Sequence, residues 1–175
     1  MGRIILVIGG AGSGKSEYAE RLCEKLSDGN KKFYLATMKN DGSKAYEERV
    51  KRHRKLREGK GFFTLEKERN LSELSFHGNE TVLLEDLTNL LSNFLFSDAK
   101  KPCSSTGVLE DVLAVSYKVK NIVIVMNDVF RDGICYDDST EKFLEELGIV
   151  HRMLADKADK VVKVIYGIPV ILKES

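Results

Sequence analysis

The amino-acid sequence predicts an α/β fold in which helices flank an open, mostly parallel sheet with an antiparallel C-terminal edge. Runs of β-branched and aliphatic residues, which are typical of strands buried on both faces, recur along the chain. Segments whose apolar residues have helical spacing alternate with these runs. The chain has 175 residues, which is about the length of one domain, so we expect a single domain over residues 1–175.

The first half of the chain begins with a buried strand and a helix. Residues 4–8 form a continuous aliphatic run, and the glycines after it lead into a segment with helical spacing. A turn signal at residues 41–42 precedes a highly charged segment that is also typical of a helix. We expect strands at residues 4–8, 33–36 and 62–65, and helices at residues 16–26 and 43–57.

The second half ends in two strands that are too close in sequence for a crossover. Residues 161–166 and 169–172 are separated only by a turn around Gly167, so we expect them to pair antiparallel at the edge of the sheet. We expect further strands at residues 81–85 and 121–126, helices at 86–96, 108–119 and 139–156, and loops at 97–107 and 127–138. Asp138 or Ser139 is the expected N-cap of the last helix.

The composition limits the classes of protein that this chain can belong to. Hydrophobic residues make up 42% and charged residues 31%, which excludes a wholly disordered chain. The net charge is only +1, so we expect no nucleic-acid partner. The early apolar run is too short to span a membrane and has no secretory cleavage pattern, so we expect a cytoplasmic protein without membrane insertion. We interpret Cys23, Cys103 and Cys135 as reduced structural thiols.

A glycine-rich loop carries the strongest functional signal. It follows the first strand, opens the first helix and matches the pattern G-x-x-x-x-G-K-[ST], which binds nucleoside triphosphates in P-loop NTPases. Glycines allow the backbone N–H groups to point at one phosphate, and the helix N-terminus adds a positive partial charge. We expect Lys15 to reach the β- and γ-phosphates and Ser16 to contact Mg²⁺. The loop residues are Gly9, Gly10, Ala11, Gly12, Ser13, Gly14, Lys15 and Ser16.

Two classes of P-loop protein are excluded by the rest of the sequence. A regulatory GTPase carries D-x-x-G and N-K-x-D motifs, and neither occurs here. A large motor ATPase needs a longer chain. The remaining class is a small-molecule kinase or transferase with a P-loop NTPase-like fold.

Acidic residues follow another buried strand of the predicted sheet. Glu85 and Asp86 come at the carboxyl end of residues 81–84, the edge at which open α/β sheets bind ligands. Either carboxylate can hold Mg²⁺, although Asp86 can equally be the N-cap of the next helix. Asn127 and Asp128 end the next buried strand, where they either line the same cleft or form a plain turn.

The predicted helix at residues 43–57 ends in a basic run with one histidine. Six of the nine residues at 49–57 are Lys or Arg, and a solvated helix face or a nucleic-acid patch are two possible interpretations. In a third, Arg49 and Arg57 lie one turn on either side of His53 and favour its neutral form, a nucleophile that could attack an α-phosphorus. The spacing does not decide among the three.

Together these residues resemble the bifunctional adenosylcobinamide kinase and adenosylcobinamide-phosphate guanylyltransferase family of cobalamin biosynthesis. The resemblance covers almost the whole chain, and its most specific element is Arg-Val-x-x-His-Arg at residues 49–54. The other matching segments are residues 9–16, 34–37, 64–66, 83–88 with Asn93, 127–129, 158–159 and 167–169.

The resemblance implies two reactions at one site. The family phosphorylates adenosylcobinamide with a nucleoside triphosphate and then transfers GMP from GTP to that phosphate through a guanylylated histidine. His53 matches the histidine, and Glu85 matches the acidic residue after the third strand. The implied catalytic residues are therefore His53, Lys15 and Glu85, and the implied metal site is Ser16 with Glu85.

The family also implies substrates, partners and further contacts. The implied substrates are ATP, GTP and a corrinoid, the implied ion is Mg²⁺, and the implied assembly is a homotrimer. The nucleotide site extends to Thr37, Arg49, Arg54 and Glu66.

The chain departs from the family pattern in three places. Gly12 stands where the family has Arg, and residues 130–136 and 149–151 differ from the family's segments at those positions. A phosphotransferase with kinase activity only, or a non-catalytic protein that senses GTP or ATP, are the alternatives to the bifunctional enzyme.

Overall fold

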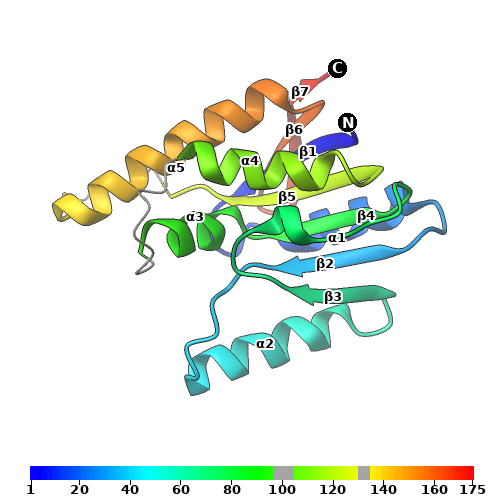
Figure 1. The fold of residues 1–175 in the computed structure, drawn as a ribbon, viewed down its shortest axis with the longest axis horizontal. Coiled ribbons are helices and arrows are strands. Elements are labelled where there is room, and N and C mark those ends of the chain that lie inside the picture. The colour runs from blue at the N-terminus through cyan, green and yellow to red at the C-terminus, as the bar shows by residue number, and fades with distance from the viewer. Residues whose placement is uncertain (97–104, 130–134) are drawn as a thin grey trace.

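The fold is a seven-stranded sheet with helices on both faces, as the computed structural model shows for residues 1–96, 105–129 and 135–175 (Figure 1). The strand order is β3-β2-β4-β5-β1-β6-β7, and every neighbouring pair is parallel except β6 with β7. This confirms the predicted fold class. The strands are β1 (Arg3–Gly9), β2 (Lys32–Ala36), β3 (Phe62–Glu66), β4 (Thr81–Glu85), β5 (Asn121–Asn127), β6 (Lys160–Ile165) and β7 (Ile168–Glu174).

The helices divide between the two faces of the sheet. On one face Ile4, Leu6 and their neighbours pack against α3, α4 and α5, while on the other Ile5 and Val7 pack against α1. Successive residues of β1 therefore pack alternately into two hydrophobic cores, one on each face of the sheet, as expected for a central strand. Helix α2 lies beyond β3, at the edge of the sheet (Figure 1). The helices are α1 (Lys15–Ser27), α2 (Lys44–Arg57), α3 (Leu87–Leu95), α4 (Ser105–Ser116) and α5 (Asp138–Lys157).

Both ends of α4 and the N-cap of α5 differ from the prediction because tertiary contacts and capping geometry decide them. Helix α4 begins at Ser105, three residues before the predicted start at residue 108. The Ser105 N–H donates to the Glu146 carboxylate of α5 at 2.9 Å. It ends at Ser116, whose carbonyl accepts from Gly2 N at 2.7 Å. The N-cap of α5 is Asp137, which accepts from Thr140 N at 3.0 Å, so neither Asp138 nor Ser139 has that role.

The structure also bears on the remaining predictions, which concern a loop, the cysteines and membrane spans. A short 3-10 helix, η1 (Leu71–Glu73), was not predicted, and its fully buried Leu71 joins the core beside α4. The expected loop at 97–107 lies mostly outside the described residues, as does Cys103. Cys23 is a free thiol inside the core, where burial raises its pKa, whereas the free thiol of Cys135 is exposed. None of the helices in the described part of the chain is long and apolar enough to cross a membrane.

The turn that leads into β4 is organised by Glu80. Its side chain is 1% exposed and accepts the backbone N–H groups of His77 and Gly78 at 2.9 Å. Its carbonyl accepts from Lys120 N at 2.9 Å, so the same residue links the starts of β4 and β5. Burial by itself would raise the pKa of this carboxyl, but the backbone donors outweigh it and hold the pKa below its ordinary value.

We expect Glu80→Gln to lower the free energy of unfolding by about 1–3 kcal/mol near neutral pH, because hydrogen bonds to a charged acceptor are lost. The folded pKa lies below the unfolded one, so the carboxylate stabilises the protein fully above about pH 4.3. That stabilisation is lost as the pH falls through the folded value. Urea unfolding at a series of pH values measures the difference between the two proteins.

Glu110→Gln is the matched control, because Glu110 is exposed. A penalty for Glu80→Gln that stays constant in acid would contradict this account of the turn.

Candidate active site

The site is assembled by the parallel register of the central strands. Gly9 at the end of β1 pairs with Asn127 at the end of β5, and Glu85 at the end of β4 pairs with Ala36 at the end of β2. Parallel strands carry their carboxyl ends to one edge, so four segments far apart in the sequence deliver polar groups to the same place.

The glycine-rich loop follows β1 and is shaped by two left-handed glycines. Gly12 and Gly14 have φ values of +69° and +85°, and the Ser13 N–H donates to the Gly10 carbonyl at 3.2 Å. Gly14 is the N-cap of α1 and supplies no side-chain hydrogen bond, which leaves the first-turn N–H groups of α1 for a ligand. At Gly9 a Cβ would lie 2.9 Å from the Val164 carbonyl oxygen, so the close approach of β6 requires glycine there.

The β6–β7 turn contacts the glycine-rich loop. Gly167 N donates to the Ser13 carbonyl at 2.8 Å, and a Cβ on Gly14 would lie 3.3 Å from the Gly167 Cα. From the sequence, Gly167 is predicted to lie in a turn, with no part in the site. Only the tertiary structure brings residue 167 to residue 13.

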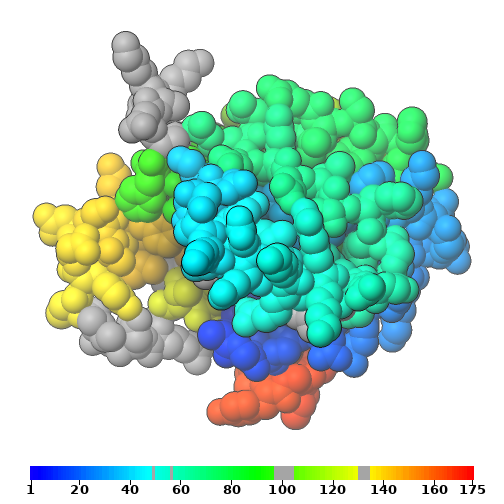
Figure 2. Space-filling view, turned by 90° about the horizontal axis from the view of Figure 1, so that it is seen from below, coloured from blue at the N-terminus to red at the C-terminus, as the bar shows by residue number. Residues whose placement is uncertain are grey.

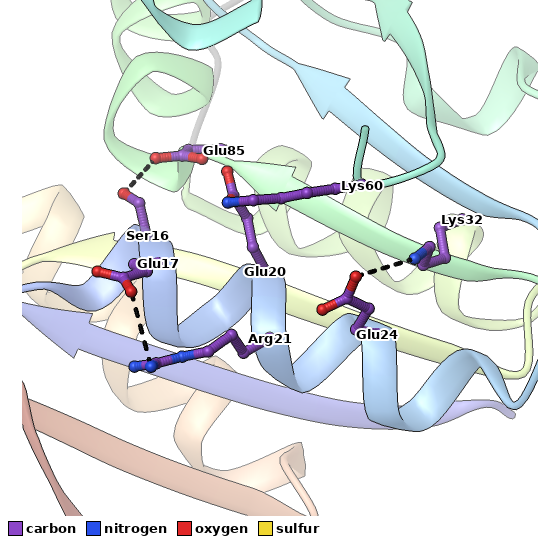
Figure 3. Close-up of polar contacts among 8 residues, drawn as sticks. All are labelled: Ser16, Glu17, Glu20, Arg21, Glu24, Lys32, Lys60 and Glu85. Atoms are coloured by element: carbon purple, nitrogen blue, oxygen red, sulfur yellow. Dashed lines mark hydrogen bonds and ion pairs between the residues drawn. The ribbon is translucent and has the colours of Figure 1, made fainter. Parts of the chain in front are cut away.

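Ser16 and Glu85 join the loop to β4. Ser16 Oγ donates to Glu85 Oε1 at 2.5 Å, across the space between α1 and the sheet (Figure 3). The second oxygen, Oε2, is buried and has no hydrogen-bond partner among the described residues. Lys15 Nζ donates to the Gly10 carbonyl at 3.2 Å, so its ammonium group folds back over the loop.

Asp86 is held in a different way from Glu85. One of its oxygens accepts from Asn89 N at 2.7 Å, which makes it the N-cap of α3, and the other accepts from Asn127 Nδ2 at 3.0 Å. Both oxygens are thus engaged, whereas Glu85 keeps one available. This difference favours Glu85 as the residue that meets a cation.

The two carboxyl groups sit in an environment that favours their neutral forms. Burial raises the pKa of Glu85, and the neighbouring charge of Asp86 raises it further, against hydrogen bonds from Ser16 and Tyr34. Burial likewise raises the pKa of Asp86. A bound cation would reverse this preference by compensating the negative charge.

The donor set fits Mg²⁺ of the kind that accompanies a nucleotide. Among the described residues no group of three or more His, Cys, Asp or Glu side chains could hold a metal by itself. Mg²⁺ usually takes only one or two protein ligands and completes its shell with phosphates and water. The Ser16 hydroxyl and the free oxygen of Glu85 match that pattern.

A cavity of about 320 Å³ connects these groups to α2. His53 lines it from the helix, and Lys15, Ser16 and Glu85 line it from the other side. A second cavity on the other side of the loop again has Lys15 and His53 in its wall. Seen from below, α2 and the N-terminal segment lie on the same face of the molecule (Figure 2). The first cavity is also lined by Gly12, Tyr34, Ala36, Met38, Tyr46, Val50, Arg52, Arg54, Arg57, Thr64, Glu66, Asp86, Asn89 and Asn127.

The other predicted site residues take different positions. Arg54 and Glu66 both line the cavity and pair at 3.1 Å on its exposed rim. Thr37 is fully buried, and its hydroxyl donates to the Asp86 carbonyl at 2.7 Å. The side chain of Arg49 lies outside the described residues. Asp128 pairs with Lys163 at 2.6 Å instead of joining Asn127 in the wall of the cavity.

Tyr34 and Arg57 are site residues whose role the sequence analysis missed. The Arg57 guanidinium lies 3.3 Å from the centre of the Tyr34 ring, and both side chains are buried. We expected Arg57 to share a helix face with His53, and both do line the cavity. No spacing rule pairs residue 57 with residue 34, so the stack could not be found before the fold.

Two solved structures share the fold of this chain. The flagellar accessory protein FlaH from Methanocaldococcus jannaschii aligns with a TM-score of 0.53 and 14% identity, over 99% of this chain and 79% of that one. A second solved structure, described as an ATPase domain, aligns with a TM-score of 0.54 and 12% identity, over 98% and 77% of the two chains. At these identities the likeness shows the fold alone.

Relatives with closer sequences cover the full length. The bifunctional adenosylcobalamin biosynthesis protein CobU of Escherichia coli K12 is 30% identical over 97% of this chain and 99% of its own. CobP of Pseudomonas aeruginosa is 28% identical over 96% of each chain. A family model described as cobinamide kinase / cobinamide phosphate guanyltransferase matches residues 5–172. The chain therefore belongs to the cobinamide kinase / cobinamide phosphate guanyltransferase family.

Proposed function

We propose that this chain is a bifunctional enzyme of cobalamin biosynthesis built on one nucleotide-binding domain over residues 1–175. It phosphorylates adenosylcobinamide with a nucleoside triphosphate such as ATP and then transfers GMP from GTP to adenosylcobinamide phosphate. The observation that carries the proposal is the shared cavity, in which His53 of α2 faces the phosphate loop. Family membership supports both reactions.

The phosphate loop serves the kinase reaction. The first-turn N–H groups of α1 and the ammonium of Lys15 bind the triphosphate, and Ser16 with Glu85 would hold Mg²⁺. When bound there, the ion would supply positive charge against the charge that develops on the phosphate oxygens. The corrinoid hydroxyl oxygen bonds to the γ-phosphorus and its proton passes to solvent, while the bond from that phosphorus to the β-phosphate oxygen breaks and the nucleoside diphosphate leaves.

The histidine serves the transfer reaction. An imidazole nitrogen of His53 attacks the α-phosphorus of GTP, a P–N bond forms, and the bond to the departing pyrophosphate breaks. A phosphate oxygen of adenosylcobinamide phosphate then attacks the same phosphorus, and the P–N bond breaks to release His53. Arg54 and Glu66 contact the nucleotide at the rim, and buried Thr37 supports the site through the Asp86 carbonyl. Arg49 is proposed as a further nucleotide contact on the family resemblance alone.

We also propose that the assembled enzyme is a homotrimer. The edge strand β7 exposes an apolar surface that adjoins the turn supporting the phosphate loop. An unpaired edge with large exposed apolar side chains favours association with further copies of the chain. This surface consists of Ile165, Tyr166, Ile168, Val170, Ile171 and Leu172.

The transfer reaction predicts a covalent intermediate on His53. Incubation with Mg²⁺ and GTP labelled at the α-phosphate should label the protein through a bond that is labile in acid and stable in alkali. His53→Ala should abolish the label, and His77→Ala, at an exposed histidine, should retain it. Corrinoid-dependent ATP turnover without any label would identify a kinase only, and GTP binding without either activity would identify a sensing protein.

The raised pKa of Glu85 predicts that cation binding depends on pH. A protonated carboxyl cannot hold the ion, so the affinity for Mn²⁺ with a bound nucleotide should begin to fall, on acidification, at a pH above the ordinary glutamate value of about 4.3. Glu85→Gln should weaken Mn²⁺ binding by about tenfold or more in a titration followed by electron paramagnetic resonance. Glu17→Gln, which removes a carboxylate from the exposed start of α1, should leave it unchanged.

The β7 surface predicts an assembly that charge can disrupt. Replacement of both Ile168 and Leu172 by Lys should convert the trimer to monomers, because two charges would have to be buried in the interface. Sedimentation equilibrium gives the mass. Tyr117→Lys, at an exposed aromatic residue after α4, is the control. A wild-type monomer, or a variant that remains a trimer, would refute this interface.

A further inference from the structure

Arg57 is unlike the other cations of α2. Among the α2 side chains that the structure describes, which exclude those of Arg49 and Leu56, Arg57 alone is buried, with 7% of it exposed. Its guanidinium lies over the Tyr34 ring at 3.3 Å, and its Nη1 has no hydrogen-bond partner among the described residues. The stack on the Tyr34 ring therefore stabilises the buried guanidinium in the way that a carboxylate partner usually does.

Tyr34 connects this arginine to the metal-site carboxylate. It lies in β2, is 4% exposed, and belongs to the core that packs against α1. Burial raises the pKa of the phenol, as do the charge of Glu85 and a side-chain hydrogen bond with it, while the charge of Arg57 lowers it. Ser16 bonds to Glu85, Arg57 stacks on Tyr34, and Tyr34 and Glu85 line the same cavity, so these four residues lead from the phosphate loop to α2.

Two side-chain ion pairs also attach α2 and the turn after it to the rest of the protein. Arg54 pairs with Glu66 at 3.1 Å, but both side chains are more than half exposed. Lys60, just beyond the helix, pairs with Glu20 of α1 at 2.5 Å (Figure 3); the Glu20 side chain is buried and that of Lys60 is 33% exposed, so this pair holds the turn and not α2 itself. The exposed Arg54–Glu66 pair contributes little to the position of α2, whereas the desolvated cation–π contact of Arg57 contributes more.

We propose that Arg57 is the positioning residue of the transfer reaction: its stack on Tyr34 sets the position of His53 relative to the phosphate loop. His53 precedes Arg57 by four residues, so the two side chains project from the same face of α2, one turn apart. A displacement of the buried guanidinium moves the imidazole with it. The inference rests on the proposed role of His53 as nucleophile.

The stack needs the shape of a guanidinium and not only its charge. A planar guanidinium covers an aromatic face and is weakly hydrated, whereas an ammonium is a compact, strongly hydrated point charge. Lysine at residue 57 keeps the charge but loses the flat contact. The alternative is that Arg57 binds a phosphate of the nucleotide directly with its Nη1, and it predicts a different pattern of effects.

The test measures four quantities in Arg57→Met, Arg57→Lys and Tyr34→Phe. They are the single-turnover rate of His53 labelling by α-labelled GTP, the dissociation constant for GTP, the rate of corrinoid phosphorylation with ATP, and the melting temperature. Lys51→Met removes a cation from an exposed position of the same helix and is the matched control.

We expect labelling to slow by about 100-fold in Arg57→Met and about tenfold in Arg57→Lys, because a nucleophile misplaced by about 1 Å loses that order of rate. Tyr34→Phe should slow labelling by about tenfold, since the ring loses its contact with Glu85. In both Arg57 variants the affinity for GTP and the kinase rate should stay within about threefold of wild type. Lys51→Met should behave as wild type in all four measurements.

Three results would overturn the inference. Labelling of Arg57→Met at the wild-type rate would show that the stack does not position His53. A tenfold or greater loss of GTP affinity in Arg57→Met, with Tyr34→Phe labelled normally, would assign Arg57 to direct phosphate binding. If Arg57→Met slows labelling and the kinase reaction by the same factor and also lowers the melting temperature, Arg57 has a general structural role. If the wild-type protein takes no label, the proposed transfer reaction fails, which is a separate outcome.

Discussion

The parallel register of β1, β2, β4 and β5 is the constraint on which the rest of the structure depends. It brings the phosphate loop, Glu85 and Asn127 to one edge, although about forty residues or more separate each from the next along the chain. Burial of the central strands on both faces makes this register hard to shift, because a slip of one residue would exchange the two cores. The hydrogen bond from Ser16 to Glu85 joins two independently positioned elements at that edge.

The charges of the molecule are arranged locally rather than globally. The net charge is +1, yet α2 carries a dense cationic run that faces a loop built for phosphates. On the opposite wall two carboxyl groups are buried with raised pKa values. A polyphosphate with a divalent cation is complementary to both walls at once, which supports the proposal that one cavity serves both reactions.

The antiparallel hairpin of β6 and β7 has two uses in this fold. Strand β6 leaves no room for a side chain on Gly9, and a Cβ on Gly14 would lie 3.3 Å from the Gly167 Cα of the turn. Gly167 also holds the loop by a backbone hydrogen bond. The outer strand of the hairpin leaves apolar side chains exposed. Assembly of copies through β7 would therefore bear directly on the position of the loop.

Local patterns determined the strands, most of the helices and the phosphate loop, because periodicity and glycine chemistry act between residues near each other in sequence. The resemblance to a family singled out His53 and Glu85. Only the tertiary structure decided the start of α4, the choice of Asp137 as N-cap and the difference between Glu85 and Asp86. It alone revealed the stack of Arg57 on Tyr34, because such contacts join atoms whose distance the fold determines and no sequence spacing encodes.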